Sequence, residues 1–185
     1  MSKAIMLSIR PKWCEKIASG EKTIEVRKTR PKLDTPFKCY IYRTKGTVPH
    51  IINGKWVQME VGGTVIGEFT CPKIELVVRG TFGKYVGRLF VEVPDPDGGI
   101  RFSTYKKIEA YEKQMCLSES EIVGYLSHSE PRGRAGYLLH ISDLRICDTP
   151  RELSEFTGLR DTRFGAAPYD IKRAPQSWCY VSDDF

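Results

Sequence analysis

The chain has 185 residues, of which 41% are hydrophobic and 28% are charged. This composition excludes an intrinsically disordered protein, a collagen-like chain and a disulfide scaffold, and the length suits one domain. Residues 1–46 hold 12 Lys and Arg against 4 Asp and Glu, whereas residues 47–185 hold 17 against 19. Because the whole positive excess lies in the first quarter, an anionic partner is the first hypothesis.

The sequence shows no signal-peptide core and no run approaching the ~20 apolar residues that a membrane span needs. Its six cysteines form no C-x-x-C pair, and its three histidines stand far apart. Dispersed cysteines of this kind are typical of free thiols in a reducing compartment. We therefore expect a soluble cytoplasmic protein with no membrane partner, no metal and no cofactor.

The first predicted elements are a strand, a helix and a second strand. Residues 4–9 alternate in the pattern of a strand. Pro11 suits the first position of a helix, and Gly20 suits its left-handed C-cap. Residues 23–27 alternate again and predict the second strand.

The middle of the chain reads as short strands. Residues 37–42 predict one strand, and Asn53-Gly54 between apolar pairs is a strong signal for a type I′ hairpin. Residues 65–78 predict one or two strands, with Pro72 at a bend, bulge or edge. Residues 79–102 are rich in glycine and contain two Pro-Asp turns, so we interpret them as an irregular or hairpin insertion.

Later segments mix helices and strands. Helices are predicted over residues 104–115, from the Ser118–Glu121 capping box to residue 126, and over 149–158. Residues 135–141 and 178–181 predict strands, and 159–172 predict a loop. Many short strands with few helices indicate a small, mostly antiparallel barrel.

A polar set follows from the strand periodicity. If Ile24 and Val26 enter the core, Glu25 and Arg27 must project from the opposite face, with Lys22 at the mouth of the strand. A compact strand–helix–strand unit could bring Ser8 and Arg10 of the first strand to the same edge. Arg offers a planar fork for a phosphate or a base edge, Lys a mobile charge, and Glu an acceptor for an exocyclic amine.

These residues resemble the ASCH family, a branch of the PUA-like superfamily, through its Gly-x-Lys-x-x-Glu-x-Arg motif at Gly20, Lys22, Glu25 and Arg27. Leu-Ser-Ile-Arg-Pro before the motif, Gly62-Gly63 and the later His-Ile-Ser are also similar to family landmarks. The resemblance covers residues 3–80 and 103–147, and residues 148–185 resemble an extension of some bacterial and phage-associated (prophage) members.

The resemblance implies a mainly β, α+β fold: a small PUA-like β-barrel decorated by short helices. We expect the ASCH barrel over residues 1–147, with an insertion near 79–102. The extension, residues 148–185, should pack on the same domain.

The resemblance also implies nucleic-acid binding, with RNA or a nucleotide as the favoured ligand, in a basic cleft beside the motif. In this hypothesis Lys22 and Arg27 hold a phosphate or base, and Glu25 accepts from a base edge. Trp178, beside Arg173, stacks on a base or is buried in the barrel. The full predicted binding set is Ser8, Arg10, Lys12, Lys22, Glu25, Arg27, Lys28, Arg30, Arg173 and Trp178.

Three alternatives stay open. Some small relatives are amidohydrolases that deacylate N4-acylcytidine, in which the equivalent of Lys22 is catalytic and a Thr stands where this chain has Glu25. Lys22 and Glu25 could therefore serve a metal-independent amidohydrolase or a ribonuclease. A third alternative is a phage or host protein-interaction module whose protein partner is unknown. Plainer roles are an ordinary Glu25–Arg27 ion pair and a hydrogen-bonded core histidine at His140.

Overall fold

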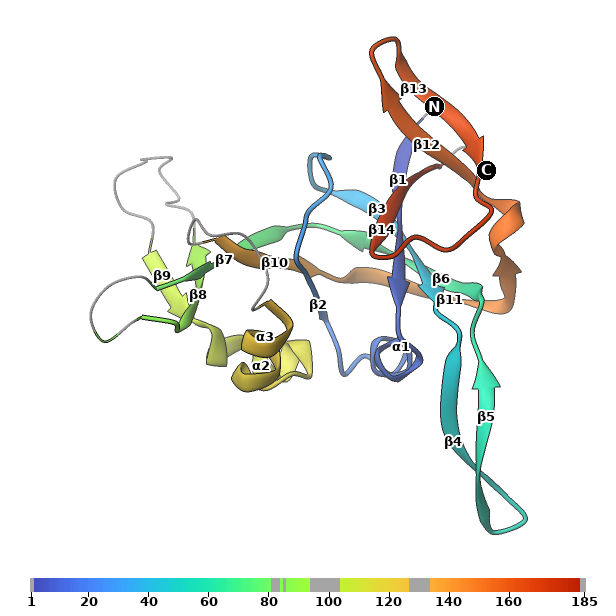
Figure 1. Ribbon diagram of the computed structural model, residues 1–185, viewed down its shortest axis with the longest axis horizontal. Coiled ribbons are helices and arrows are strands. Elements are labelled where there is room, and N and C mark those ends of the chain that lie inside the picture. Colours follow the sequence, from blue (N-terminus) through green and yellow to red (C-terminus); the bar gives the residue numbers. More distant parts are fainter. Residues whose placement is uncertain (1, 81–83, 85, 94–103, 127–133, 184–185) are drawn as a thin grey trace. The chain divides into compact units, whose positions relative to one another are not determined.

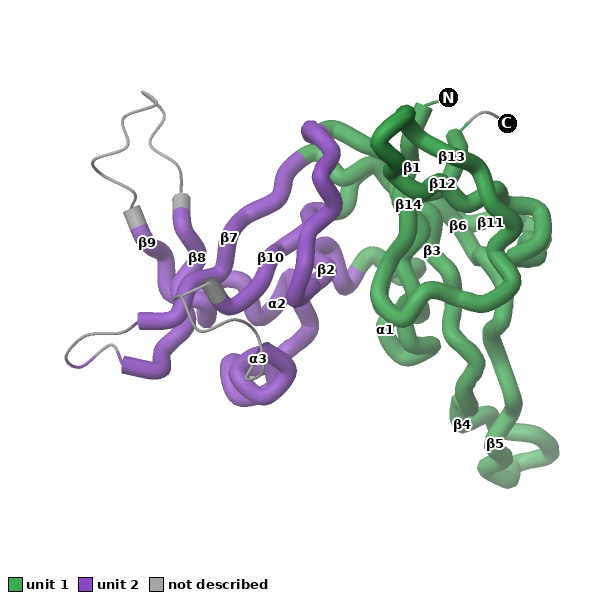
Figure 2. The backbone as a smooth tube through the Cα atoms, turned by 45° about the horizontal axis from the view of Figure 1, so that its top comes forward, with its two compact units in different colours: residues 1–20, 36–72, 141–185 green, residues 21–35, 73–140 purple. Residues whose placement is uncertain are grey.

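A computed structural model describes residues 2–80, 84, 86–93, 104–126 and 134–183. The chain forms two compact units (Figure 2). Unit 1 comprises residues 1–20, 36–72 and 141–185, and unit 2 comprises residues 21–35 and 73–140. Both units are therefore built from segments that are distant in sequence.

Unit 1 is built on a seven-stranded sheet of order β11-β6-β3-β1-β14-β12-β13. Its central strand, β1, pairs in parallel with β3 and antiparallel with β14. Residues of both faces of β1 are buried, as expected for a strand inside a sheet covered on both sides. The strands are β1 (Lys3–Ile9), β3 (Phe37–Arg43), β6 (Thr64–Cys71), β11 (Ser142–Glu152), β12 (Thr157–Thr162), β13 (Gly165–Asp170) and β14 (Trp178–Ser182).

Unit 1 also carries two helices and a separate hairpin. In α1 (Pro11–Ala18), Cys14 and Ile17 are buried while Lys12 and Glu15 face outward. The short 3-10 helix η3 spans Leu153–Glu155. The hairpin of β4 (Gly46–Ile52) and β5 (Lys55–Val61) extends away from the other strands of unit 1 (Figure 1).

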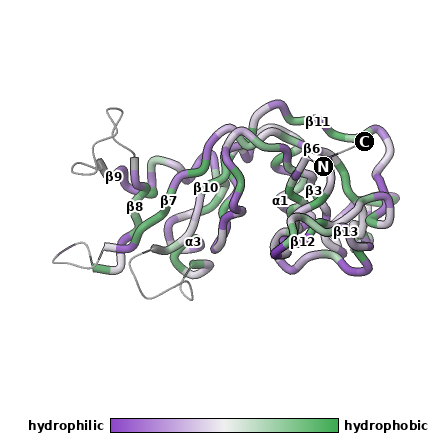
Figure 3. The backbone as a smooth tube through the Cα atoms, turned by 90° about the horizontal axis from the view of Figure 1, so that it is seen from above, coloured by the Kyte–Doolittle hydropathy of each residue, from purple (hydrophilic) through white to green (hydrophobic). Residues whose placement is uncertain are grey.

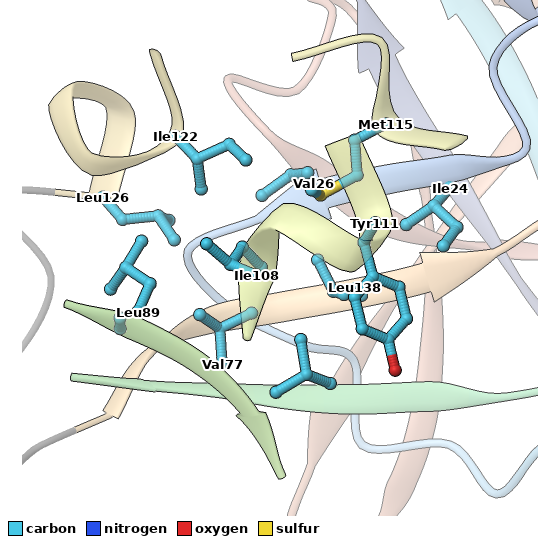
Figure 4. Packing of buried hydrophobic residues seen from close by; sticks show 12 residues of the cluster. Ile24, Val26, Val77, Leu89, Ile108, Tyr111, Met115, Ile122, Leu126 and Leu138 are labelled. Atoms are coloured by element: carbon cyan, nitrogen blue, oxygen red, sulfur yellow. The ribbon is translucent and has the colours of Figure 1, made fainter. Parts of the chain in front are cut away.

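Unit 2 is built on a five-stranded sheet of order β2-β10-β7-β8-β9. Ile24 and Val26 of β2 enter a hydrophobic cluster with side chains of the helices and of β7, β8 and β10 (Figure 4). Hydrophobic and hydrophilic stretches alternate along the strands (Figure 3). The elements are β2 (Ile24–Arg27), β7 (Ile74–Arg79), β8 (Leu89–Val93), β9 (Thr104–Lys107), η2 (Ile108–Tyr111), α2 (Glu112–Met115), α3 (Glu119–Leu126) and β10 (Arg134–His140).

The mainly β class with short helices is confirmed. Within the described residues, however, the strands form a seven-, a five- and a two-stranded sheet, each with two edge strands, so the closed barrel that we expected is not formed. The division into a barrel over 1–147 and an extension over 148–185 stays a prediction. Much of the predicted insertion near 79–102, including both Pro-Asp turns, lies outside the described residues.

Several local predictions are confirmed. The predicted type I′ turn connects β4 to β5, with φ of 51° at Asn53 and 74° at Gly54. Pro72 separates β6 from β7. At the start of α3, the Glu121 carboxylate accepts from the Ser118 backbone N–H at 2.9 Å, which completes the predicted capping box.

Three local predictions are wrong. Residues 104–107 form β9, paired with β8, and helix begins only at Ile108. Strand β11 continues through Glu152 instead of a helix starting near Thr149; Pro150 is tolerated because β11 is an edge strand. The predicted loop over 159–172 is largely the β12–β13 hairpin, turned at Gly165 with φ 107°. In each case pairing with a neighbouring strand overrides the local signal.

Among the described residues, no helix has the length and apolar character to cross a membrane.

Candidate functional site

Lys22 of the Gly-x-Lys-x-x-Glu-x-Arg motif is a buried lysine, with 2% of its surface exposed. Its ammonium donates to the backbone carbonyls of Ile24 at 2.8 Å and Met115 at 2.7 Å. It also lies 3.4 Å from a carboxylate oxygen of Glu25. These contacts join the start of β2 to the end of α2.

Glu25 and Arg27 complete this motif cluster on the face of β2 opposite Ile24 and Val26. The second carboxylate oxygen of Glu25 lies 3.1 Å from Nη2 of Arg27, and both residues are buried. One carboxylate is thus shared between two cations, which is the geometry that a buried charge requires. An ammonium with its protons directed to two carbonyls and a carboxylate presents no proton acceptor to a substrate.

Exposed cations follow directly on the motif. Lys28 and Arg30 are both exposed, and Lys28 Nζ lies 5.1 Å from the centroid of the Tyr125 ring of α3. That ring is itself 42% exposed. The end of β2 therefore presents a cation and an aromatic ring together at the surface of unit 2.

A second ion cluster in unit 2 is centred on Glu75 of β7. His140 Nε2 donates to Oε2 of Glu75 at 2.6 Å, and Lys73 Nζ donates to Oε1 at 2.6 Å. The Tyr111 hydroxyl also donates to Oε1 of Glu75, at 3.4 Å. His140 is thus the hydrogen-bonded histidine that the sequence suggested, but its side chain is 24% exposed and that of Lys73 is 52% exposed.

The electrostatics of this second cluster favour the ionised carboxylate. Burial by itself raises the pKa of Glu75, but hydrogen bonds and charge from Lys73 and His140 outweigh it and lower that pKa below its usual value. Burial and the Glu75 charge raise the pKa of Tyr111. The ionised Glu75 carboxylate is held by Nε2 of His140, and Nδ1 is the other ring nitrogen. No group in the described part of the chain hydrogen-bonds to that nitrogen.

The other predicted site residues belong to unit 1. Ser8 is buried, and its hydroxyl donates to the carbonyl of Pro175 at 2.5 Å. Arg10, at the N-cap of α1, Lys12 and Arg173 are exposed. Trp178 is half-buried on β14. Its ring packs edge-to-face with that of Tyr180, with 5.3 Å between the ring centroids.

The predicted site residues are divided between the two units. Lys22, Glu25 and Arg27 are in direct contact and continue into Lys28 and Arg30 in unit 2. Ser8, Arg10, Lys12, Arg173 and Trp178 lie in unit 1. Whether each of them contacts a ligand stays a prediction.

Sequence reasoning missed Glu75 and Tyr125. Glu75 is the one acidic residue of β7, and apolar residues flank it on both sides, so a carboxylate there needs a partner. That signal marks it as unusual, but its partner His140 is 65 residues away in sequence. Tyr125 lies among apolar residues in the predicted helical segment, and nothing in the neighbouring sequence indicates that its ring is exposed.

In the part of the chain that the structure describes, no three His, Cys, Asp or Glu side chains are grouped to hold a metal ion.

Comparison with known proteins identifies the fold. The model of the ASCH domain family matches residues 7–96. The crystal structure of ASCH from Zymomonas mobilis is similar at a TM-score of 0.56 and 17% identity, covering 98% of this chain and 89% of that one. The crystal structure of a mutant of the same Z. mobilis protein is similar at a TM-score of 0.54 and 17% identity, covering 97% of this chain and 89% of that one. No curated protein gave a significant match.

Proposed function

Because the chain contains an ASCH domain, we propose that it binds nucleic acid, with RNA as the favoured class, through exposed side chains at the end of β2. The observation that carries this proposal is the Lys28–Tyr125 pair, with Arg30 two residues further on. The contact surface, here called the Lys28 surface, consists of Lys28, Arg30 and Tyr125. It lies wholly within unit 2.

The chemistry of the Lys28 surface suits a single strand. Lys and Arg neutralise backbone phosphates and release counterions, so affinity falls as salt rises. An exposed aromatic ring stacks on a base of any sequence, which contributes about 1–3 kcal/mol per base. A base that stacks on Tyr125 would displace the Lys28 ammonium from the ring toward a neighbouring phosphate.

The motif cluster has a supporting role in this proposal. Lys22 and its two carbonyl contacts hold β2 against α2, and Glu25 with Arg27 neutralises the buried charge. In this proposal the exposed residues after the motif contact the ligand directly, and Lys22, Glu25 and Arg27 do not. Arg10, Lys12 and Arg173 of unit 1 are proposed as further phosphate contacts because they are exposed cations.

Fluorescence anisotropy with a short labelled single-stranded RNA tests this function. The Lys28→Ala/Arg30→Ala double variant should bind more weakly, and Tyr125→Ala should lose about 1–3 kcal/mol of binding free energy. The matched control is Lys106→Ala with Lys113→Ala, which removes two exposed charges from the same unit. Equal losses in the two double variants would mean that only net charge matters, and the Lys28 surface would be rejected.

A second candidate function, hydrolysis of an RNA or of a modified nucleoside, is favoured by the Glu75–His140 pair. The carboxylate orients the imidazole through Nε2, and a histidine oriented by a carboxylate is an arrangement that general bases use. That base would act on a water molecule or a ribose hydroxyl. It replaces the buried Lys22 and Glu25 as the catalytic pair.

Incubation with N4-acylcytidine and, separately, with RNA tests this second function. Deacylation or strand cleavage should be lost in His140→Ala and retained in Lys106→Ala, a control at an exposed position of β9. Product formation that is unchanged in His140→Ala, or absent from the wild type, rejects the catalytic role and leaves the binding proposal standing.

A further inference from the structure

The β4–β5 hairpin is an exposed arm of unit 1. It is defined here as residues 46–61 and forms its own two-stranded sheet, in which β4 and β5 pair only with each other (Figure 1). Along both strands every residue is exposed or half-exposed. A two-stranded ribbon with two open faces gains little stability by itself, so a surface that completes it is expected.

The outer part of the arm, residues 46–59, combines large exposed apolar groups with an absence of negative charge. Four of the exposed large hydrophobic residues of the described chain lie on it: Ile51, Ile52, Trp56 and Met59. Between residues 46 and 59 there is no Asp or Glu, while Lys55 adds a positive charge at the tip. The one acid of the arm, Glu60, pairs with Thr47 near the base, so no carboxylate of the arm lies near its tip.

The register of the hairpin places these groups on two faces. Trp56 lies directly opposite Ile51, so the two side chains share one face and form an apolar wedge. Lys55 lies opposite Ile52 on the other face, together with His50. The wedge and the cation therefore lie back to back beside the Asn53-Gly54 turn, and Trp56 is 72% exposed.

The base of the arm is held in a fixed geometry. Gly62 and Gly63 have φ of 95° and 92°, values that favour glycine. A Cβ on Gly62 would lie 2.1 Å from the carbonyl oxygen of Thr44. The Gly63 N–H donates to the carbonyl of Arg43 at 2.7 Å. The exit from β5 to β6 thus depends on these two glycines.

We propose that the arm is a second nucleic-acid contact, in which Trp56 stacks on an unpaired base and Lys55 meets a backbone phosphate. This proposal rests on the proposed nucleic-acid binding but concerns a site in unit 1, separate from the Lys28 surface. Base stacking on an exposed indole requires no sequence specificity, and the lack of carboxylates over residues 46–59 avoids repulsion of phosphates near the tip. Charge complementarity favours this occupant over a second copy of the chain, whose arm would bring another Lys55 to the contact.

Titration of single-stranded RNA with Trp56→Ala and Trp56→Phe tests the proposal. We expect Trp56→Ala to weaken binding by about 5- to 100-fold, and Trp56→Phe to retain most of the affinity because the ring still stacks. Phe164→Ala is the matched control, since Phe164 is 86% exposed at the tip of the β12–β13 hairpin. RNA should also quench tryptophan fluorescence in the wild type and much less in Trp56→Phe.

Several outcomes overturn the arm proposal. One is an unchanged RNA affinity in Trp56→Ala; another is an equal loss in Trp56→Ala and Phe164→Ala. Light scattering that shows a dimer in the wild type and a monomer in Trp56→Ala, with unchanged RNA affinity, assigns the arm to self-association instead. A loss in Trp56→Ala with no effect of Lys28→Ala/Arg30→Ala supports the arm while rejecting the Lys28 surface, so the two proposals fail separately.

Discussion

Two ion clusters on the sheet of unit 2 are each centred on a buried glutamate but have different surroundings. Each places one buried glutamate between two cationic or hydrogen-bonding partners: Glu25 between Lys22 and Arg27, and Glu75 between Lys73 and His140. Leu139 of β10 lies opposite Glu25, and Leu138 lies opposite Glu75. Because neighbouring strand residues point to opposite sides, the clusters lie on opposite faces of the sheet.

The difference lies in the partners of the two glutamates. Both partners of Glu25 are buried, whereas Lys73 and His140 reach the surface. A fully buried cluster can fix the backbone but cannot meet a substrate without opening. A cluster with exposed partners can do both. The residues of the Gly-x-Lys-x-x-Glu-x-Arg motif are thus enclosed, whereas the partners of Glu75 are open to solvent.

The largest expected effect is that of Lys22→Met. This substitution keeps the length of the side chain but leaves two carbonyls and one side of Glu25 without their donor. Breaking a buried ion pair from one side costs about 3–5 kcal/mol of unfolding free energy. Urea denaturation measures it, with Lys106→Met at an exposed position expected to change stability by no more than about 0.5 kcal/mol. A loss as small as that of the control would show that the motif cluster does not fix the fold.

Glu75→Gln should have an intermediate effect. The amide retains the shape but provides a weaker acceptor for Lys73 and His140, and we expect a loss of about 1–3 kcal/mol at neutral pH. The pKa of Glu75 is lowered in the folded state, so its stabilising contribution is present above the unfolded value of 4.5 and is lost as the pH falls below it.

In Glu75→Gln the free energy of unfolding should therefore fall less than in the wild type as the pH is lowered. Thermal unfolding of the wild type and of Glu75→Gln between neutral pH and about pH 3 measures the difference, which should shrink as the pH falls. A difference that stays constant over this range would contradict an ionised, partner-stabilised Glu75.

The sequence predicted the parts of the fold whose signals are local. Alternation in β1 and β2, Pro11 and Gly20 around α1, and Asn53-Gly54 all specify structure within a few residues. The errors at β9 and β12 arose where a strand is stabilised by pairing with a distant partner. The incorrect prediction of a closed barrel has the same cause, because strand periodicity does not show which edge strands pair with each other.

The candidate site was predicted in part for the same reason. Periodicity correctly separated Ile24 and Val26 from Glu25 and Arg27, but it says nothing of burial on the second face. The contact of Lys22 with the Met115 carbonyl joins residues 93 positions apart, and no local pattern reveals it. Exposure likewise cannot be read from sequence, so Tyr125 and Trp56 emerged only from the structure.

The central claim is that the buried motif cluster supports the fold while the exposed cations after it bind nucleic acid. The most direct measurement is the salt dependence of RNA affinity, together with unfolding free energy, for Lys28→Ala/Arg30→Ala. We expect a stability change within about 0.5 kcal/mol and a slope of log affinity against log salt that is reduced by about 0.7 per cation removed. A slope equal to that of the wild type, with stability preserved, would contradict it.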